Sequence, residues 1–92
     1  MKVEIYYSKS SSRFLKKNKD ISEDLIDTSI IEAVKKITGL EENSLDIRKL
    51  KGKLKNHYRI RTGKIRIIIK IEFGIIYIVN VNNIDFRSNV YK

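Results

Sequence analysis

The chain of 92 residues lacks several residue types, and each absence excludes a class of structure. With no cysteine and one histidine, it has neither a disulfide framework nor a cysteine- or histidine-rich metal site. No apolar run approaches the roughly 20 residues that span a bilayer, and the N-terminal region has no apolar run of signal-peptide length. We therefore expect one cytoplasmic domain, residues 1–92, with no metal, cofactor or membrane contact.

Acidic residues are scarce in the second half of the chain. Residues 1–46 contain eight Lys or Arg and nine Asp or Glu, a net charge of −1. Residues 47–92 contain twelve Lys or Arg and two Asp or Glu, a net charge of +10, so the total of +9 arises from the second half. Residues 47–71 contain ten Lys or Arg and no acid. A basic face of this kind is typical of proteins that bind nucleic acid, an anionic membrane or an acidic protein segment. A solvated lysine-rich surface is the alternative.

The first half predicts one strand and two helices. Residues 2–8 alternate apolar and polar side chains, as a half-buried strand does. A short helix follows the serines of residues 8–12, and a longer one begins at Asp20, because Asp20 and Glu23 have the spacing of a capping box. Gly39 suits the left-handed position that ends a helix, and residues 41–47 form a polar connection. The longer helix carries an apolar stripe through Ile26, Ile30, Ala33 and Ile37.

The second half predicts a three-stranded antiparallel meander. From His57 on, apolar and polar side chains alternate along the sequence. This pattern predicts strands over residues 57–61, 65–71 and 75–81, joined by short connections that contain glycine. No proline interrupts them. The third strand is rich in β-branched residues and is expected to be central. Residues 82–92 begin with turn formers and are compatible with an edge strand that returns along the sheet.

These elements predict an α+β fold in which two helices pack on one face of a mainly antiparallel sheet. The isoleucines at positions 65, 67, 69 and 71 share one face and need the helices to cover them. By strand parity the opposite, open face carries Arg59, Arg61 and Arg66. Like charges a few ångströms apart repel, so this cluster favours an anionic ligand.

The second half resembles RelE toxins of the RelE/ParE toxin–antitoxin superfamily in several short motifs. They are LKG at residues 50–52, YRIR at 58–61, Gly63, IRIII at 65–69 and RSNVY at 87–91. The match covers about the last half of the chain in detail. The first half agrees only in the order of its elements.

The resemblance implies a metal-free endoribonuclease that cleaves mRNA on the ribosome and so inhibits translation. In that chemistry the RNA 2′-hydroxyl attacks the adjacent phosphate, which requires a base, an acid and cations. The resemblance also implies a cognate antitoxin, for which the basic surface favours an acidic, partly disordered segment.

Carried over by position, the motifs imply roles for individual residues. Arg59 and Arg61 orient RNA and assist deprotonation, Arg66 binds the scissile phosphate, and Arg87 contacts a phosphate. Tyr91 stacks on a base or acts as acid or base. Further cations add a salt-dependent attraction to RNA, and these are Lys49, Lys51, Lys53, Lys55 and Lys64.

The chain departs from the family pattern at several positions, which keeps two other functions open. Ile65 and Ile69 stand where tyrosine is common, and Asp85-Phe86 replaces a Gly-His pair before the terminal arginine. Arginine at positions 59 and 61 grips phosphate better than lysine but is a poorer base. The alternatives are a non-enzymatic ParE-like toxin that binds a protein such as DNA gyrase, and a catalytically inactive basic RNA-binding module.

Overall fold

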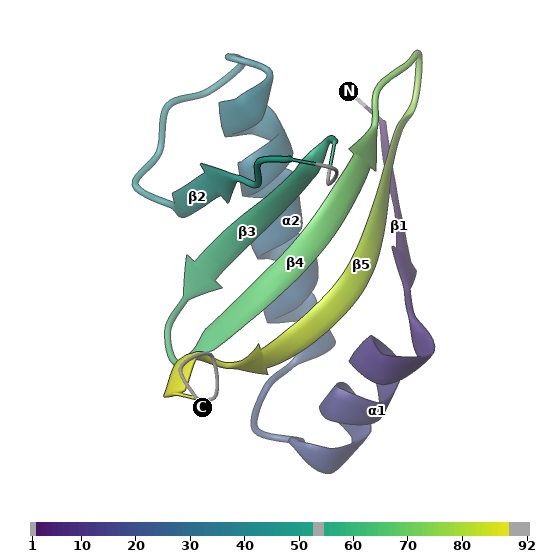
Figure 1. Cartoon of the computed structure of the whole chain (residues 1–92), viewed down its shortest axis with the longest axis vertical. Helices are drawn as coiled ribbons and strands as arrows, with labels where there is room; N and C mark the ends of the chain where they lie inside the picture. Colours follow the sequence, from purple (N-terminus) through teal and green to yellow (C-terminus); the bar gives the residue numbers. More distant parts are fainter. Residues whose placement is uncertain (1, 53–54, 89–92) are drawn as a thin grey trace.

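The protein is described by a computed structural model that covers residues 2–52 and 55–88 (Figure 1). Its elements are β1 (Val3–Tyr7), α1 (Lys9–Lys17), α2 (Glu23–Ile37), β2 (Asp46–Lys49), β3 (His57–Thr62), β4 (Ile65–Glu72) and β5 (Tyr77–Phe86). The five strands form one sheet in the order β1-β5-β4-β3-β2, in which β1 runs parallel to β5 and the other pairs are antiparallel. The α+β class and the meander of β3, β4 and β5 are therefore confirmed.

The core lies between the helices and one face of the sheet, because the apolar side chains of β4 alternate. Ile65, Ile67, Ile69 and Ile71 are each at most 1% exposed. They join Ile26, Ile30, Ala33 and Val34 of α2 in one buried cluster. Figure 1 shows α2 behind the sheet, with α1 beside the end of β5. In the described part of the chain, no helix is long and apolar enough to cross a membrane.

The start of α2 differs from the prediction. Ser22, not Asp20, is the N-cap, and its Oγ accepts a hydrogen bond of 3.1 Å from the Leu25 N–H. Residues 18–21 form a turn instead, closed by a bond of 2.9 Å from the Ile21 N–H to the Asn18 carbonyl. Burial of Ile21 in the core favours this turn, since Ile21 is only 7% exposed.

The end of α2 follows the prediction. Gly39 has φ +76°, its N–H donates to the Lys36 carbonyl, and the Leu40 N–H donates to the Lys35 carbonyl. These two bonds define a Schellman motif, which requires a residue with positive φ. The backbone therefore turns sharply after Gly39, while the Leu40 side chain stays 64% exposed.

Two strand predictions are wrong. The connection predicted over residues 41–47 contains the start of β2, a four-residue edge strand whose only partly buried residue is Ile47. So short and polar a strand carries no clear periodicity, and it forms because β3 offers its backbone edge. Residues 82–86 do not return along the sheet but extend β5. Asn82 is the extra residue of a bulge, since Ile68 pairs with Asn83 and Ile69 with Val81.

We expect the two faces of the sheet to respond differently to loss of a methylene group. Ile67→Val should lower the free energy of unfolding by about 0.5–1.5 kcal/mol, because Ile67 is fully buried. Ile75→Val is the matched control, and it should change stability by less than about 0.5 kcal/mol because Ile75 is fully exposed. Urea denaturation measures both. Equal losses would contradict this placement of the core.

Candidate RNA-binding face

The open face of the sheet brings together the three arginines predicted to share it. Arg61 and Arg66 are direct partners across β3 and β4, and Arg59 is opposite Ile68. All three belong to the strand positions that point away from the helices, because their neighbours Ile60 and Ile67 are in the core. The cluster therefore follows from strand alternation and pairing register.

Arg59 does not face solvent, contrary to the expectation for this acid-free run. It is only 7% exposed, and its Nη2 lies 3.0 Å from Oδ1 of Asp46 on the edge strand β2. A buried guanidinium is stable only when a negative charge compensates it. Asp46 thus supplies that compensation from one residue before the acid-free run. Because sequence reasoning missed β2, it also missed Asp46 as a member of this site.

Arg66 has a different environment from Arg59. Its side chain is partly exposed, and among the described residues none forms an ion pair with it. Its partner across β4 and β5 is Asp85, whose Oδ1 accepts a bond of 2.8 Å from the Phe86 N–H. A partly exposed guanidinium without an ion-pair partner among the described residues is suited to bind an anion such as phosphate.

Arg87 lies at the same end of the sheet as the Arg61–Arg66 pair. Its N–H donates to the Lys64 carbonyl at 2.9 Å, and its Nη1 donates to the Gly63 carbonyl at 3.2 Å. The turn between β3 and β4 therefore holds Arg87 beside this pair. Tyr91, the other member of the terminal motif, lies outside the described residues.

Lys64 is already engaged by an acid of the first half. Its Nζ lies 2.7 Å from Oδ2 of Asp20 and 5.8 Å from the centre of the Phe86 ring. The hydrogen bond from Lys64 lowers the pKa of Asp20, whereas its slight burial opposes this effect. Both side chains are largely exposed, so this pair contributes little to stability.

The other predicted RNA-binding lysines lie apart from the arginine cluster. Lys49, Lys51 and Lys55 are exposed and line a shallow pocket near the junction of β2 and β3. β3 begins at His57, which pairs with Lys70 of β4, whereas Arg66 pairs with Arg61. Positions 66 and 70 are four residues apart on β4, so the pocket end of the sheet lies about 13 Å from the arginine cluster. These lysines therefore suit contacts along an extended chain. Lys53 lies outside the described residues.

Two of the departures from the family pattern belong to the core. Ile65 and Ile69 are 1% and 0% exposed, and they face the helices. Phe86 packs its ring against Phe14 at a centroid distance of 5.1 Å. The departures on the open face are Asp85 and the arginines at positions 59 and 61. In the described ranges, no group of three or more His, Asp or Glu side chains is placed to hold a metal ion.

Three solved structures resemble this chain over nearly its whole length. A YoeB/ParE toxin from Agrobacterium tumefaciens is 17% identical with a TM-score of 0.60, covering 95% of this chain and 99% of its own. A YafQ variant from E. coli is 13% identical with a TM-score of 0.61, covering 99% and 100%. The RelB–RelE antitoxin–toxin complex from Methanococcus jannaschii contains a chain 24% identical with a TM-score of 0.52, covering 95% of each.

These likenesses concern the fold. No protein-family model and no curated protein matches the sequence. The arrangement of two helices on a five-stranded sheet is the fold of these toxin structures, which is the fold that the motif resemblance implies.

We expect the Arg59–Asp46 pair to matter more for stability than the exposed Lys64–Asp20 pair. Asp46→Asn should lower the free energy of unfolding by about 1–2 kcal/mol, because a buried guanidinium loses its charged acceptor while the half-exposed carboxylate limits the effect. Urea denaturation at pH 7 measures the loss.

Asp20→Asn is the matched control for that experiment. It should cost less than Asp46→Asn, and 1 M salt should remove most of its effect by screening. Because the folded-state pKa of Asp20 is lowered, its small contribution is present above the unfolded-state pKa and is lost as the pH falls through the folded-state pKa. A larger loss at Asp20 than at Asp46 would contradict the assigned roles.

Proposed function

We propose that this protein is the toxin of a type II toxin–antitoxin system and a metal-free endoribonuclease that cleaves mRNA on the ribosome. The observation that carries the proposal is the cluster of Arg59, Arg61 and Arg66 on the open face of a RelE/ParE-type fold. The motif resemblance of residues 50–91 to RelE toxins supports the same reaction.

The proposed reaction requires this face to stabilise negative charge on the phosphate. The RNA 2′-oxygen forms a bond to phosphorus, the bond from phosphorus to the 5′-oxygen breaks, and a proton moves from the first oxygen to the second. The phosphate gains negative charge in the transition state, and fixed cations lower that barrier. Arg66 is suited to bind the phosphate oxygens, because its guanidinium is partly exposed and forms no ion pair with a described residue.

Neighbouring residues take supporting roles in this proposal. Arg61 lies opposite Arg66 and contacts the same phosphate or the next one, whereas Arg59 is fixed by Asp46 and orients the RNA. Arg87 adds a phosphate contact at the same end of the sheet. Lys49, Lys51 and Lys55 attract the flanking RNA in a salt-dependent way. Tyr91 is assigned base stacking or proton transfer by the motif alone.

A cognate antitoxin is the proposed regulatory partner. One of the similar structures is an antitoxin–toxin complex, RelB–RelE. The basic surface of the second half suits an acidic segment that is partly disordered when free and orders on binding. Ribosome-bound mRNA as the substrate places the proposed activity in the cytoplasm.

The phosphate role of Arg66 is tested by substitution. Arg66→Ala should reduce cleavage of ribosome-bound mRNA by about 10²–10³-fold while the domain stays folded, because a preorganised cation is lost at the reacting phosphate. Arg66→Lys should give an intermediate rate, since lysine keeps the charge but loses the bidentate geometry. Primer extension on a ribosome complex with a defined A-site codon measures cleavage.

Lys35→Ala is the control, because it removes one positive charge from α2, on the other side of the sheet. Unimpaired cleavage by Arg66→Ala would falsify the phosphate assignment.

Expression in bacteria tests the class of activity, and blocked translation with cut mRNA supports the proposal. Stalled replication with DNA damage would indicate a gyrase-directed toxin, and absence of toxicity would indicate an inactive RNA-binding module.

A further inference from the structure

A second group of cations lies on α1, outside the open face of the sheet. Lys9, Arg13, Lys16 and Lys17, here called the α1 stripe, are all exposed. Their spacing of four, three and one residues places them on one side of the helix. The stripe covers about 12 Å along the helix axis. Lys19 follows it in the loop and is exposed as well.

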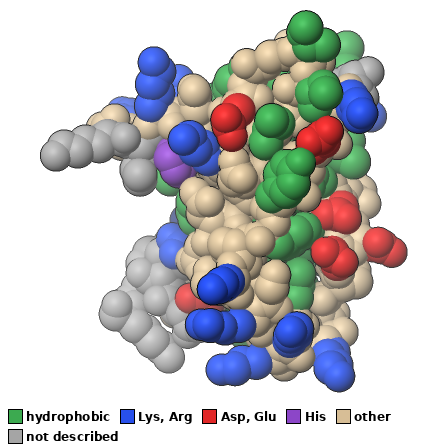
Figure 2. All heavy atoms as spheres, turned by 90° about the vertical axis from the view of Figure 1, so that its right-hand side faces the viewer, with side chains coloured by type: hydrophobic (Ala, Val, Ile, Leu, Met, Phe, Trp, Pro, Cys, Tyr) green, Lys and Arg blue, Asp and Glu red, His purple; other side chains and the backbone are tan. Residues whose placement is uncertain are grey.

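The net charge of the first half conceals this stripe. Residues 9–19 contain five Lys or Arg and no acid, whereas Asp20, Glu23 and Asp24 follow at the start of α2. Within the described ranges, no residue of the stripe forms an ion pair. Figure 2 shows Lys and Arg side chains gathered at the lower end of the molecule, where α1 lies, with acidic side chains higher on the right. The stripe is therefore available to an anionic partner.

The other side of α1 holds the helix to the domain. Ser11 is fully buried and donates a hydrogen bond of 3.0 Å to the Val81 carbonyl, while Phe14 and Leu15 pack against the core. The apolar side chains of α1 are thus turned inward. A membrane-surface helix needs an exposed apolar face, and a protein interface needs apolar or aromatic anchors at its centre. The stripe provides only charge, which fits contacts to phosphates.

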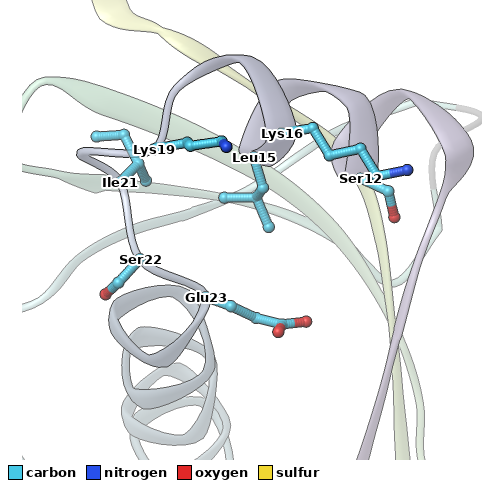
Figure 3. A pocket seen from close by; sticks show the side chains of 7 residues that line it. All are labelled: Ser12, Leu15, Lys16, Lys19, Ile21, Ser22 and Glu23. Carbon is cyan, nitrogen blue, oxygen red and sulfur yellow. The ribbon is translucent and has the colours of Figure 1, made fainter.

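A hollow between α1 and the start of α2 borders the stripe and limits where a polyanion can lie (Figure 3). Lys16, Lys19 and Ser12 line it from the α1 side, and Glu23 lines it from α2. The carboxylate of Glu23 repels phosphates from the α2 side. A bound strand is therefore expected to cross α1 rather than α2.

We infer that the α1 stripe binds the sugar–phosphate backbone of double-stranded RNA. Single-stranded RNA is held through aromatic side chains that stack on its bases, and the stripe has none. The major groove of double-stranded RNA is too narrow for side chains to read, so the duplex is recognised mostly through phosphate and 2′-hydroxyl contacts, and a row of cations can make the phosphate contacts without sequence preference. The choice of RNA over DNA rests on the proposed function.

The stripe and the open face belong to the same end of the molecule. The Asp20–Lys64 pair joins the loop after α1 to the turn between β3 and β4, and the Phe14–Phe86 contact joins α1 to the end of β5. In Figure 1 these segments lie together at the lower end. A base-paired segment on α1 would therefore hold neighbouring single-stranded RNA near Arg61 and Arg66.

Duplex binding by the purified protein tests this inference. The probe is a blunt 20-base-pair RNA duplex, and its affinity is measured by fluorescence anisotropy over a range of salt concentrations. The triple variant Arg13→Gln, Lys16→Gln, Lys17→Gln should bind at least tenfold more weakly. The slope of log affinity against log salt should fall by about 0.9 for each phosphate that the variant no longer neutralises.

The matched control is the double variant Lys2→Gln, Lys35→Gln, which is compared with the α1 double variant Arg13→Gln, Lys16→Gln. It makes the same change in net charge away from both α1 and the open face, and it should weaken binding less than threefold. Equal losses of affinity by the two double variants would overturn the inference, because charge alone would then explain binding. A DNA duplex of the same sequence that binds equally tightly, with the same loss in the α1 variant, would overturn the choice of RNA. A larger loss of affinity by the α1 variant for single-stranded poly(U) than for the duplex would overturn the choice of a double-stranded ligand.

The result is separable from the proposed nuclease activity. Arg66→Ala should reduce cleavage by about 10²–10³-fold and retain duplex affinity, because Arg66 lies on the open face. If the protein cleaves no RNA but the α1 variant alone loses duplex affinity, the nuclease proposal fails and the α1 inference stands. If cleavage proceeds as proposed but the α1 variant keeps full duplex affinity, the α1 inference fails. Circular dichroism confirms that each variant is folded.

Discussion

The alternation of side chains along β4 determines where both the core and the candidate site lie. Its odd-numbered isoleucines are packed against α2, so its even-numbered residues, including Arg66, point to the open face. A one-residue slip in register would exchange the two sets and place charged side chains in the core. The cost of burying Arg66 and Lys70 in that way makes the observed register strongly preferred. Packing on one face therefore fixes the chemistry available on the other.

Electrostatics then divides the arginines of the open face into two kinds. Arg59 is buried and compensated by Asp46, so its position is set by the protein before any ligand arrives. Arg66 is partly exposed and forms no ion pair with a described residue. Oriented cations that need no rearrangement are what stabilises developing charge most effectively. In the proposed reaction, the fixed Arg59 orients the RNA and the partly exposed Arg66 holds the phosphate.

The distribution of charge in the first half shows how a net value can mislead. Its near-neutral sum arises from a basic α1 and an acidic start of α2 that are separated by a single loop. Attraction to a polyanion depends on local potential, which falls off within about a Debye length of 10 Å, rather than on the sum over a domain. The two ends of this loop therefore present opposite surfaces to a partner.

The sequence by itself determined what depends on local periodicity. The alternation of residues 57–71 predicted the meander and the shared face of Arg59, Arg61 and Arg66, and the position of Gly39 predicted the end of α2. Only the tertiary structure decided what depends on distant partners. β2 exists because β3 offers an unpaired edge, and Asp46 reaches Arg59 only across that pairing. Ser22 caps α2 because Ile21 is buried in a core assembled from remote segments. Short edge strands and caps carry weak local signals, so long-range packing selects among them.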